Sequence, residues 1–372
     1  SKGVELANNV GITASGTTNA ADLGAILKAT TGVVKATVLA DTAVKLNSAL
    51  KDANSADALT LSVNGTTVTA KDLLALGGKT SKATITVNVS AITGNITEIT
   101  DVFVTGGKFI ASIGADDVTI SGTVKASEAD AIADKTSGTV TATIAAGNAN
   151  VLNTALDDSV SQVNAYKITV SGDNANATDL LGLDSKTSIA VDASAIKNIT
   201  IKTGAELTGA ADIKDVYVAA GKKDISGLGN ETVDLSKATD ANASLVKAIN
   251  DYTTGVITLP TITFDNVVTN FSLSQLGDLN GITGLANIKA DNGVADAINI
   301  SLKDLLAAND SKENIIFDIT GESSSDKVTL SDYSGWTVAD ATANLAQYVF
   351  TNSTTEQTIT ININAIDDTK VL

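Results

Sequence analysis

One eleven-residue segment occurs twice in the chain, and each copy runs directly into an alternating pattern of apolar and polar residues. The copies are residues 70–80 (AKDLLALGGKT) and 177–187 (ATDLLGLDSKT), which lie 107 residues apart. A third, more divergent copy spans residues 303–312. Self-similarity at a fixed period is the signature of repeat architectures, so the fold and the function have to be interpreted through the repeats.

Two further landmarks give a similar period. A helical pattern followed by a strand pattern starts near residues 19, 127 and 239, and the glycines that separate the two, Gly32, Gly138 and Gly255, are 106 and 117 residues apart. The sequence DVFV at 101–104 matches DVYV at 215–218, at a spacing of 114. These landmarks predict an opening segment at 1–17, repeats at 18–124, 125–236 and 237–335, and a truncated repeat with a C-terminal tail at 336–372.

The amino-acid composition favours β-strands. Hydrophobic residues make up 43% of the chain but aromatic residues only 3%, so the core must consist of Val, Ile, Leu and Ala. Residues 139–144 alternate in the way that puts Val140, Ala142 and Ile144 on one face of a strand and threonines on the other. Further short strands are expected at 166–170, 188–191, 199–202, 216–218 and 232–235, and a helix-then-strand pattern is expected again from 336.

We therefore expect a repeat protein that is mainly β with short helices. Two architectures remain open: a β-solenoid-like stack, in which each coil buries its apolar face on the next, and tandem β-rich modules, in which each repeat closes its own core. The close spacing of the strands and the Leu-Leu pairs favour the stack.

The residue types that are missing exclude much chemistry. The sequence contains no Cys, Met, His or Arg, so it offers no Ser-His-Asp triad, thiol nucleophile or imidazole metal ligand. The net charge of −17 opposes binding to nucleic acid, and no stretch is long and apolar enough to span a membrane. The sequence predicts a protein that is not an enzyme, binds no nucleic acid and spans no membrane.

Candidate site residues are few. Asp72 and Asp179 are expected to begin short helices and accept hydrogen bonds from free backbone N–H groups, whereas Lys79 and Lys186 are expected in solvated turns. In GADDVTI, at 114–120, Asp116 and Asp117 are a candidate calcium site because glycine can turn the chain and carboxylates supply hard oxygen ligands. The alternative, which the sequence favours, is the start of a strand with exposed acids.

The segments 137–147, 166–172, 179–187 and 191–194 resemble repeats of bacterial surface-layer proteins of the Campylobacter surface-array type. The resemblance implies a crystalline coat outside the cell, type I secretion with an uncleaved C-terminal signal, and calcium-assisted assembly. It also implies anchoring to lipopolysaccharide through a region outside this chain. Residues 358–372 fit an export tail, but the calcium-binding nonapeptides common in such proteins are missing.

The sequence thus predicts an extracellular structural protein whose copies form a two-dimensional lattice on the bacterial surface. The alternative is the stalk of an adhesin that binds a receptor. An adhesin predicts one divergent repeat at its tip, and residues 237–335, which contain Pro260, are the divergent repeat here.

Overall fold

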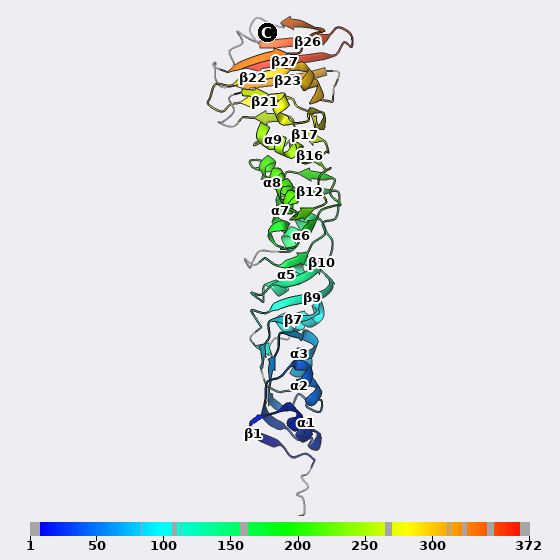
Figure 1. Cartoon of the computed structure of the whole chain (residues 1–372), viewed down its shortest axis with the longest axis vertical. Coiled ribbons are helices and arrows are strands. Elements are labelled where there is room, and N and C mark those ends of the chain that lie inside the picture. The colour runs from blue at the N-terminus through cyan, green and yellow to red at the C-terminus, as the bar shows by residue number, and fades with distance from the viewer. Residues whose placement is uncertain are drawn as a thin grey trace, which may run out of the picture. The chain divides into compact units, whose positions relative to one another are not determined.

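The fold is known from a computed structural model, which describes residues 8–82, 84–105, 110–111, 113–156, 163–264, 270–310, 312, 314–321, 326–340 and 346–364. Short helices and short strands alternate along the chain, and the strands form several small sheets (Figure 1). The expected strand-rich fold with short helices is confirmed. The part of the C-terminal tail at 365–372 lies outside the described residues.

The chain divides into two compact units. The first comprises Ser1–Ala146, Val151–Thr169 and Ser185–Ala190, and the second comprises Gly147–Asn150, Val170–Asp184 and Val191–Leu372. This division does not follow the five segments that the sequence landmarks predict, and those segments stay a prediction.

The strands of the first unit form three sheets, in which all pairings among the described residues are parallel. The first sheet contains β1 (Ile12–Thr18), β2 (Val34–Val38) and β3 (Ala58–Thr60), and the second contains β4 (Ser62–Asn64), β6 (Ile85–Asn88) and β8 (Ile110–Ala111). The third has the order β11 (Ala165–Lys167), β10 (Val140–Ile144), β9 (Asp117–Val124), β7 (Ala91–Asn95), β5 (Thr67–Thr69). Paired residues are 20–26 positions apart in sequence.

Register in the third sheet separates an apolar face from a polar face. Four residues in adjacent strands are buried side by side: Val68, Ile92, Val118 and Val140. The next position along the same strands places four threonines in register: Thr69, Thr93, Thr119 and Thr141. Because successive side chains of a strand point to opposite faces, the apolar row forms the core and the threonines lie on the outside. The alternation predicted for 139–144 is confirmed.

The second unit contains longer connections and one antiparallel edge. One sheet has the order β12 (Asn174–Asn176), β14 (Asn198–Thr200), β16 (Thr232–Asp234), β17 (Ile257–Thr258), β20 (Ile282–Thr283), and β13 (Val191–Asp192) pairs with β15 (Ile225–Ser226). A further sheet contains β19 (Asn270–Ser272), β22 (Ala297–Ser301) and β24 (Lys327–Ser331). The largest has the order β18 (Thr261–Thr263), β21 (Asn287–Ala290), β23 (Asn314–Gly321), β27 (Thr358–Asn364), β26 (Ala346–Asn352), β25 (Trp336–Asp340). Only β25, β26 and β27 pair antiparallel among the described strands.

Short helices lie in the connections between the parallel strands. They are α1 (Ala20–Ala29), α2 (Ala43–Ala49), α3 (Ala70–Gly77), α4 (Ile96–Thr100) with a π-helical turn η1 (Asp101–Thr105), α5 (Ala126–Ala133), α6 (Ala149–Ala155), α7 (Ala177–Ser185), α8 (Gly209–Lys222), α9 (Ala243–Asn250) and α10 (Leu302–Ala307), with 3-10 turns η3 (Leu273–Leu276) and η4 (Leu279–Gly281). Several begin after a residue whose side-chain oxygen accepts the N–H three residues on, which satisfies a free donor of the first turn: Asn19, Thr42, Thr69, Asn95, Asn242 and Ser301.

Three sequence predictions of local structure are wrong. The strand expected at 188–191 begins only at Val191, the first residue of β13. Residues 216–218 lie in α8, not in a strand, because Ile213, Val216 and Tyr217 are buried at helical spacing. Three consecutive apolar residues do not distinguish a strand from the buried face of a helix. The predicted helix from residue 336 is instead β25 where the structure describes it, and residues 341–345 lie outside the described part of the chain.

A threonine recurs in the turn that follows several helices. Its hydroxyl donates to the carbonyl of a residue 20–22 positions earlier at 2.7 Å and accepts the N–H of the residue two positions later at 3.0–3.1 Å. The five threonines are Thr30, Thr80, Thr136, Thr187 and Thr253. Each hydroxyl therefore joins the turn to an earlier strand or strand-like segment.

Candidate functional site

Asp72 and Asp179 occupy equivalent local positions. Each lies in the first turn of a helix that directly follows a strand, α3 after β5 and α7 after β12. Thr69 donates its hydroxyl to Asp72 at 2.7 Å, and the Asn176 amide donates to Asp179 at 3.1 Å. The placement of both carboxylates at a helix start is as predicted.

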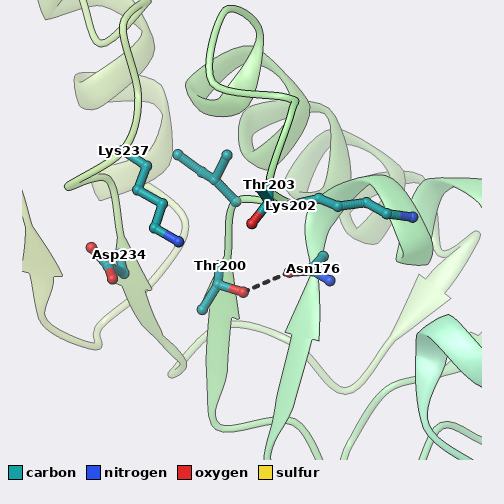
Figure 2. Close-up of a pocket in the computed structure, with 7 residues that line it drawn as sticks. Asn176, Thr200, Lys202, Thr203, Asp234 and Lys237 are labelled. Atoms are coloured by element: carbon teal, nitrogen blue, oxygen red, sulfur yellow. Dashed lines mark hydrogen bonds between the residues drawn. The ribbon is translucent and has the colours of Figure 1, made fainter.

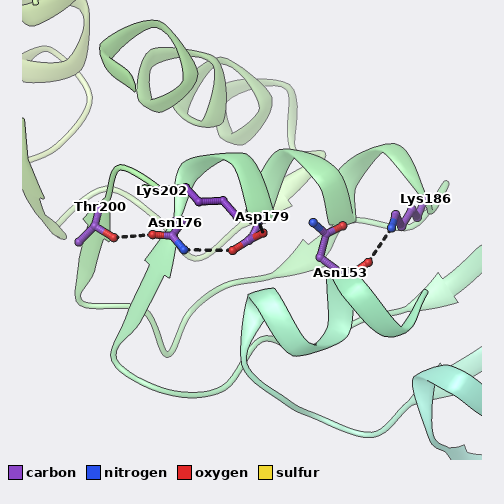
Figure 3. A network of polar contacts seen from close by, with 6 residues as sticks. All are labelled: Asn153, Asn176, Asp179, Lys186, Thr200 and Lys202. Atoms are coloured by element: carbon purple, nitrogen blue, oxygen red, sulfur yellow. Dashed lines mark hydrogen bonds and ion pairs between the residues drawn. The ribbon is translucent and has the colours of Figure 1, made fainter. Parts of the chain in front are cut away.

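Asp179 differs from Asp72 in its depth and in its charged partner. The side chain of Asp179 is 2% exposed, and its Oδ1 atom lies 2.9 Å from the ammonium of Lys202, whose side chain is 51% exposed. A buried carboxylate is costly without a partner, so Lys202 compensates its charge. The pair also fixes Lys202 on one side of the α7 helix start (Figure 3).

The prediction for Lys79 and Lys186 is wrong. Both side chains are partly buried, and each donates to carbonyls at the end of an earlier helix: Lys79 to Leu50 O at 3.1 Å, and Lys186 to Asn153 O at 2.7 Å and to Leu156 O. Figure 3 shows the contact of Lys186 with Asn153. A cation at a helix C-terminus satisfies carbonyls that have no intrahelical donor and complements the helix dipole.

A polar pocket lies where three parallel strands of the second unit end. Asn176, Thr200 and Asp234 are the last residues of β12, β14 and β16. The turn after β14 and Lys237, in the turn after β16, complete the lining (Figure 2). The cavity volume is about 460 Å³. Ligands of parallel α/β sheets commonly bind outside the carboxyl ends of the strands, because the loops that leave these ends supply polar groups.

Hydrogen bonds within the protein hold one wall of the pocket in place. Thr200 donates its hydroxyl to Asn176 Oδ1 at 2.8 Å, and Asn176 in turn donates its amide to Asp179. Asp179 also holds Lys202. Figure 3 shows this chain of four residues, and Figure 2 shows the ammonium of Lys202 pointing away from the centre of the pocket. Lys202 therefore contributes its stem to the wall, and its charge is compensated by Asp179.

The opposite wall carries charges of both signs. Asp234 accepts the N–H of Ser236 at 2.9 Å, which shapes the turn that leads to Lys237. Lys237 extends into the pocket with its ammonium toward Thr200 and Asp234 (Figure 2). The pKa of Glu206 lies below its usual value, chiefly because its carboxylate accepts the N–H of Gly204, with a smaller contribution from the charge of Lys237.

The candidate calcium ligands Asp116 and Asp117 differ in burial. Asp116 is 7% exposed, and its Oδ2 atom has no hydrogen-bond partner among the residues that the structure describes, so the prediction of exposed acids at this strand start is wrong for Asp116. Asp117 is exposed, and its Oδ1 accepts the N–H of Thr139 at 2.7 Å. Asp117 is the first residue of β9 and Asp116 directly precedes it, so the two carboxylates differ in depth, and calcium binding by this pair stays a prediction. Within the described ranges, no three His, Cys, Asp or Glu side chains gather as a metal site.

Asp116 leads to a testable pH dependence. Burial raises the pKa of its carboxyl above the ordinary 3.8, and the charge of Asp117 raises this pKa further. The folded state therefore binds a proton that the unfolded state has lost, and stability falls as pH rises through the folded pKa. We expect the free energy of unfolding, measured by urea denaturation from pH 3.5 to 7, to fall less steeply with pH in Asp116→Asn than in the wild type. Parallel curves would contradict the assignment.

The sequence analysis missed the residues of the pocket. It placed strands at 199–202 and 232–235, but it did not connect their polar ends with Asn176. One sequence feature could have indicated the pocket: β12, β14 and β16 each end in a polar residue, Asn, Thr or Asp, that follows a buried residue.

Comparison of the chain with protein-family models, curated proteins and solved structures finds no match. No helix in the described part of the chain is long and apolar enough to cross a membrane.

Proposed function

We propose that this chain is a structural protein of the bacterial cell surface, in which successive coils stack as a β-solenoid within each unit and copies assemble into a two-dimensional lattice. The observation that carries the proposal is the parallel register. Residues of one strand pair with residues of a later strand, commonly 20–34 positions further along the chain, and the same face stays apolar from strand to strand. Stacking of this kind buries apolar faces that a single coil would leave open.

Polar side chains outside the core also form hydrogen bonds from one strand to the next. The amide of Asn88 donates to Asn64 at 3.2 Å, and the amide of Asn198 donates to Asn174 at 2.9 Å, each pair being in register on neighbouring strands. These groups satisfy one another along the stack instead of converging on a substrate. Together with the absence of His and Cys from the sequence, this supports a role in assembly and not in catalysis.

The cellular context belongs to the same proposal. We propose an extracellular location reached by type I secretion, on the resemblance of residues 137–194 to surface-array repeats. Lipopolysaccharide would be bound by a region outside this chain. Calcium would act by screening repulsion between copies that each carry a charge of −17, and not through the Asp116 and Asp117 pair.

A second candidate function is an adhesin stalk. The observation that favours it is the antiparallel addition of β25 and β26 to β27, which departs from the parallel pairing elsewhere in the described chain. A divergent element of this kind is what a receptor-binding tip would require. An adhesin remains soluble as single copies, so the test of the lattice separates the two functions.

Electron microscopy of the purified chain is expected to show ordered sheets when millimolar calcium is added. Sodium chloride at the same ionic strength is the control, because it screens exposed charges without supplying a divalent cation. Sheets in calcium alone support calcium-assisted assembly, and sheets in both salts support a lattice formed by screening. Single copies in every condition would contradict the lattice and favour the adhesin.

A further inference from the structure

We propose that the pocket at the ends of β12, β14 and β16 binds an acidic sugar, that is, a monosaccharide unit bearing a carboxylate. This site does not depend on the lattice, because a protein that fails to form sheets keeps the same pocket. Its volume of about 460 Å³ is within the range of small-molecule sites.

The fixed wall presents an acceptor to a ligand. The hydroxyl proton of Thr200 is directed to acceptors within the protein, Asn176 Oδ1 at 2.8 Å or Ala175 O at 3.5 Å. A hydroxyl has one proton and two lone pairs, so the oxygen of Thr200 can still accept from a ligand. Because Asn176 is itself held by buried Asp179, this acceptor is in position before a ligand arrives.

The opposite wall adds a second acceptor and a cation. The Asp234 carboxylate uses Oδ1 for the N–H of Ser236, and a carboxylate has further lone pairs for ligand hydroxyls. Lys237 forms no hydrogen bond or ion pair of 4 Å or less with any residue that the structure describes. The net charge of the chain is −17, but the ammonium of Lys237 points into the polar cavity and attracts anions locally.

These groups together select the ligand class. The acceptors Thr200 and Asp234 require a ligand with hydroxyl donors, and Lys237 favours a negative group on the same molecule. Inorganic phosphate carries only one or two O–H groups at neutral pH, and its charge, which exceeds that of a single carboxylate, is repelled by Asp234. A neutral sugar supplies the hydroxyl groups but offers no negative group to the ammonium of Lys237. An amino acid supplies both charges, but it lacks the several hydroxyls that Thr200, Thr203 and Asp234 could bind. A carboxylate-bearing sugar satisfies both requirements.

The test is to titrate the full chain separately with D-glucuronate, D-glucose, glycine and inorganic phosphate. Calorimetry or NMR chemical-shift changes measure the binding. We expect glucuronate to bind in the millimolar range and at least tenfold more tightly than each of the other three. A tenfold loss corresponds to about 1.4 kcal/mol. Glucose, glycine or phosphate binding as tightly as glucuronate would overturn the assignment, and so would the absence of glucuronate binding.

Two variants locate the site. Lys237→Gln removes the charge of an exposed side chain that forms no ion pair of 4 Å or less with the described residues, and we expect it to weaken glucuronate binding at least tenfold. Lys247→Gln is the matched control, because Lys247 is an exposed lysine on α9 whose ammonium contacts Asp251 and does not line the pocket. Equal binding by the wild type and Lys237→Gln would overturn the proposal. A circular dichroism spectrum for each variant verifies that the chain is folded.

Discussion

Replacement of Gly138 by alanine is expected to lower the free energy of unfolding by about 3 kcal/mol. An added Cβ would lie 2.3 Å from the carbonyl oxygen and 2.4 Å from the carbonyl carbon of Asp116, and 2.7 Å from the backbone nitrogen of Asp117. Backbone atoms cannot rotate away as a side chain can, so the two segments would have to separate. Their separation would also stretch the 2.7 Å hydrogen bond from Thr136 to the Asp116 carbonyl. Urea denaturation followed by circular dichroism measures the loss.

The control for this prediction is Gly77→Ala. Gly77 ends α3, and an added Cβ there would meet no heavy atom within 4 Å. Alanine costs less conformational entropy than glycine in a helix, so this variant is expected to be as stable as the wild type or up to about 1 kcal/mol more stable. If Gly138→Ala were as stable as Gly77→Ala, close backbone approach would not be the reason for glycine at position 138.

The same contact explains the glycine landmarks that the sequence analysis used only for counting. At Gly32 and Gly255 an added Cβ would lie 2.4 Å from the carbonyl carbon of Val10 and 2.1 Å from the carbonyl oxygen of Glu231. The sequence shows that these glycines recur, together with a threonine two residues earlier. It does not show which backbone lies opposite, because that depends on the stacking of segments that are more than twenty residues apart.

The missed pocket residues and the failed prediction for Lys186 share a cause. A search at a period near 110 residues finds long-range copies, but strand neighbours in the structure are commonly 20–34 residues apart and the spacing varies. The three strand ends of the pocket are separated by 24 and 34 residues, so no fixed period aligns Asn176, Thr200 and Asp234. Lys186 likewise finds its carbonyl partners 30 and 33 residues earlier, outside any local motif.

One local sequence pattern marks the starts of several strands, and its meaning becomes clear from the pairing of the strands. A buried acid or amide precedes a buried strand residue by two positions at Asp57, Asp116, Asn164, Glu231, Asp296 and Asp326. The sequence analysis considered Asp116 alone among these residues and favoured the interpretation that it is exposed. Burial follows from a feature that one strand cannot reveal: at Asp57, Asn164 and Asp326, a side-chain oxygen accepts a backbone N–H from an earlier segment.

Replacement of Asp57 by alanine is therefore expected to lower the free energy of unfolding by about 3 kcal/mol, because two hydrogen bonds to backbone donors are lost. Asp57 is 1% exposed, and it accepts the N–H of Val34 at 2.8 Å and that of Asn54 at 2.9 Å. Asp57→Asn should lose about half as much, because an amide oxygen can replace one acceptor, as Asn164 does for the N–H of Val140 at 2.9 Å. Chemical denaturation of both variants gives the comparison.

Asp52→Ala is the matched control, because Asp52 is an exposed acid five residues away and its replacement should change stability by no more than about 0.5 kcal/mol. The order of the three variants then distinguishes hydrogen bonding from charge. If acceptance of the Val34 N–H is what matters, Asp57→Asn lies between the wild type and Asp57→Ala. If Asp57→Asn were as unstable as Asp57→Ala, the negative charge and not the acceptor geometry would connect this strand start to the earlier segment, and Asn164 would need a separate explanation.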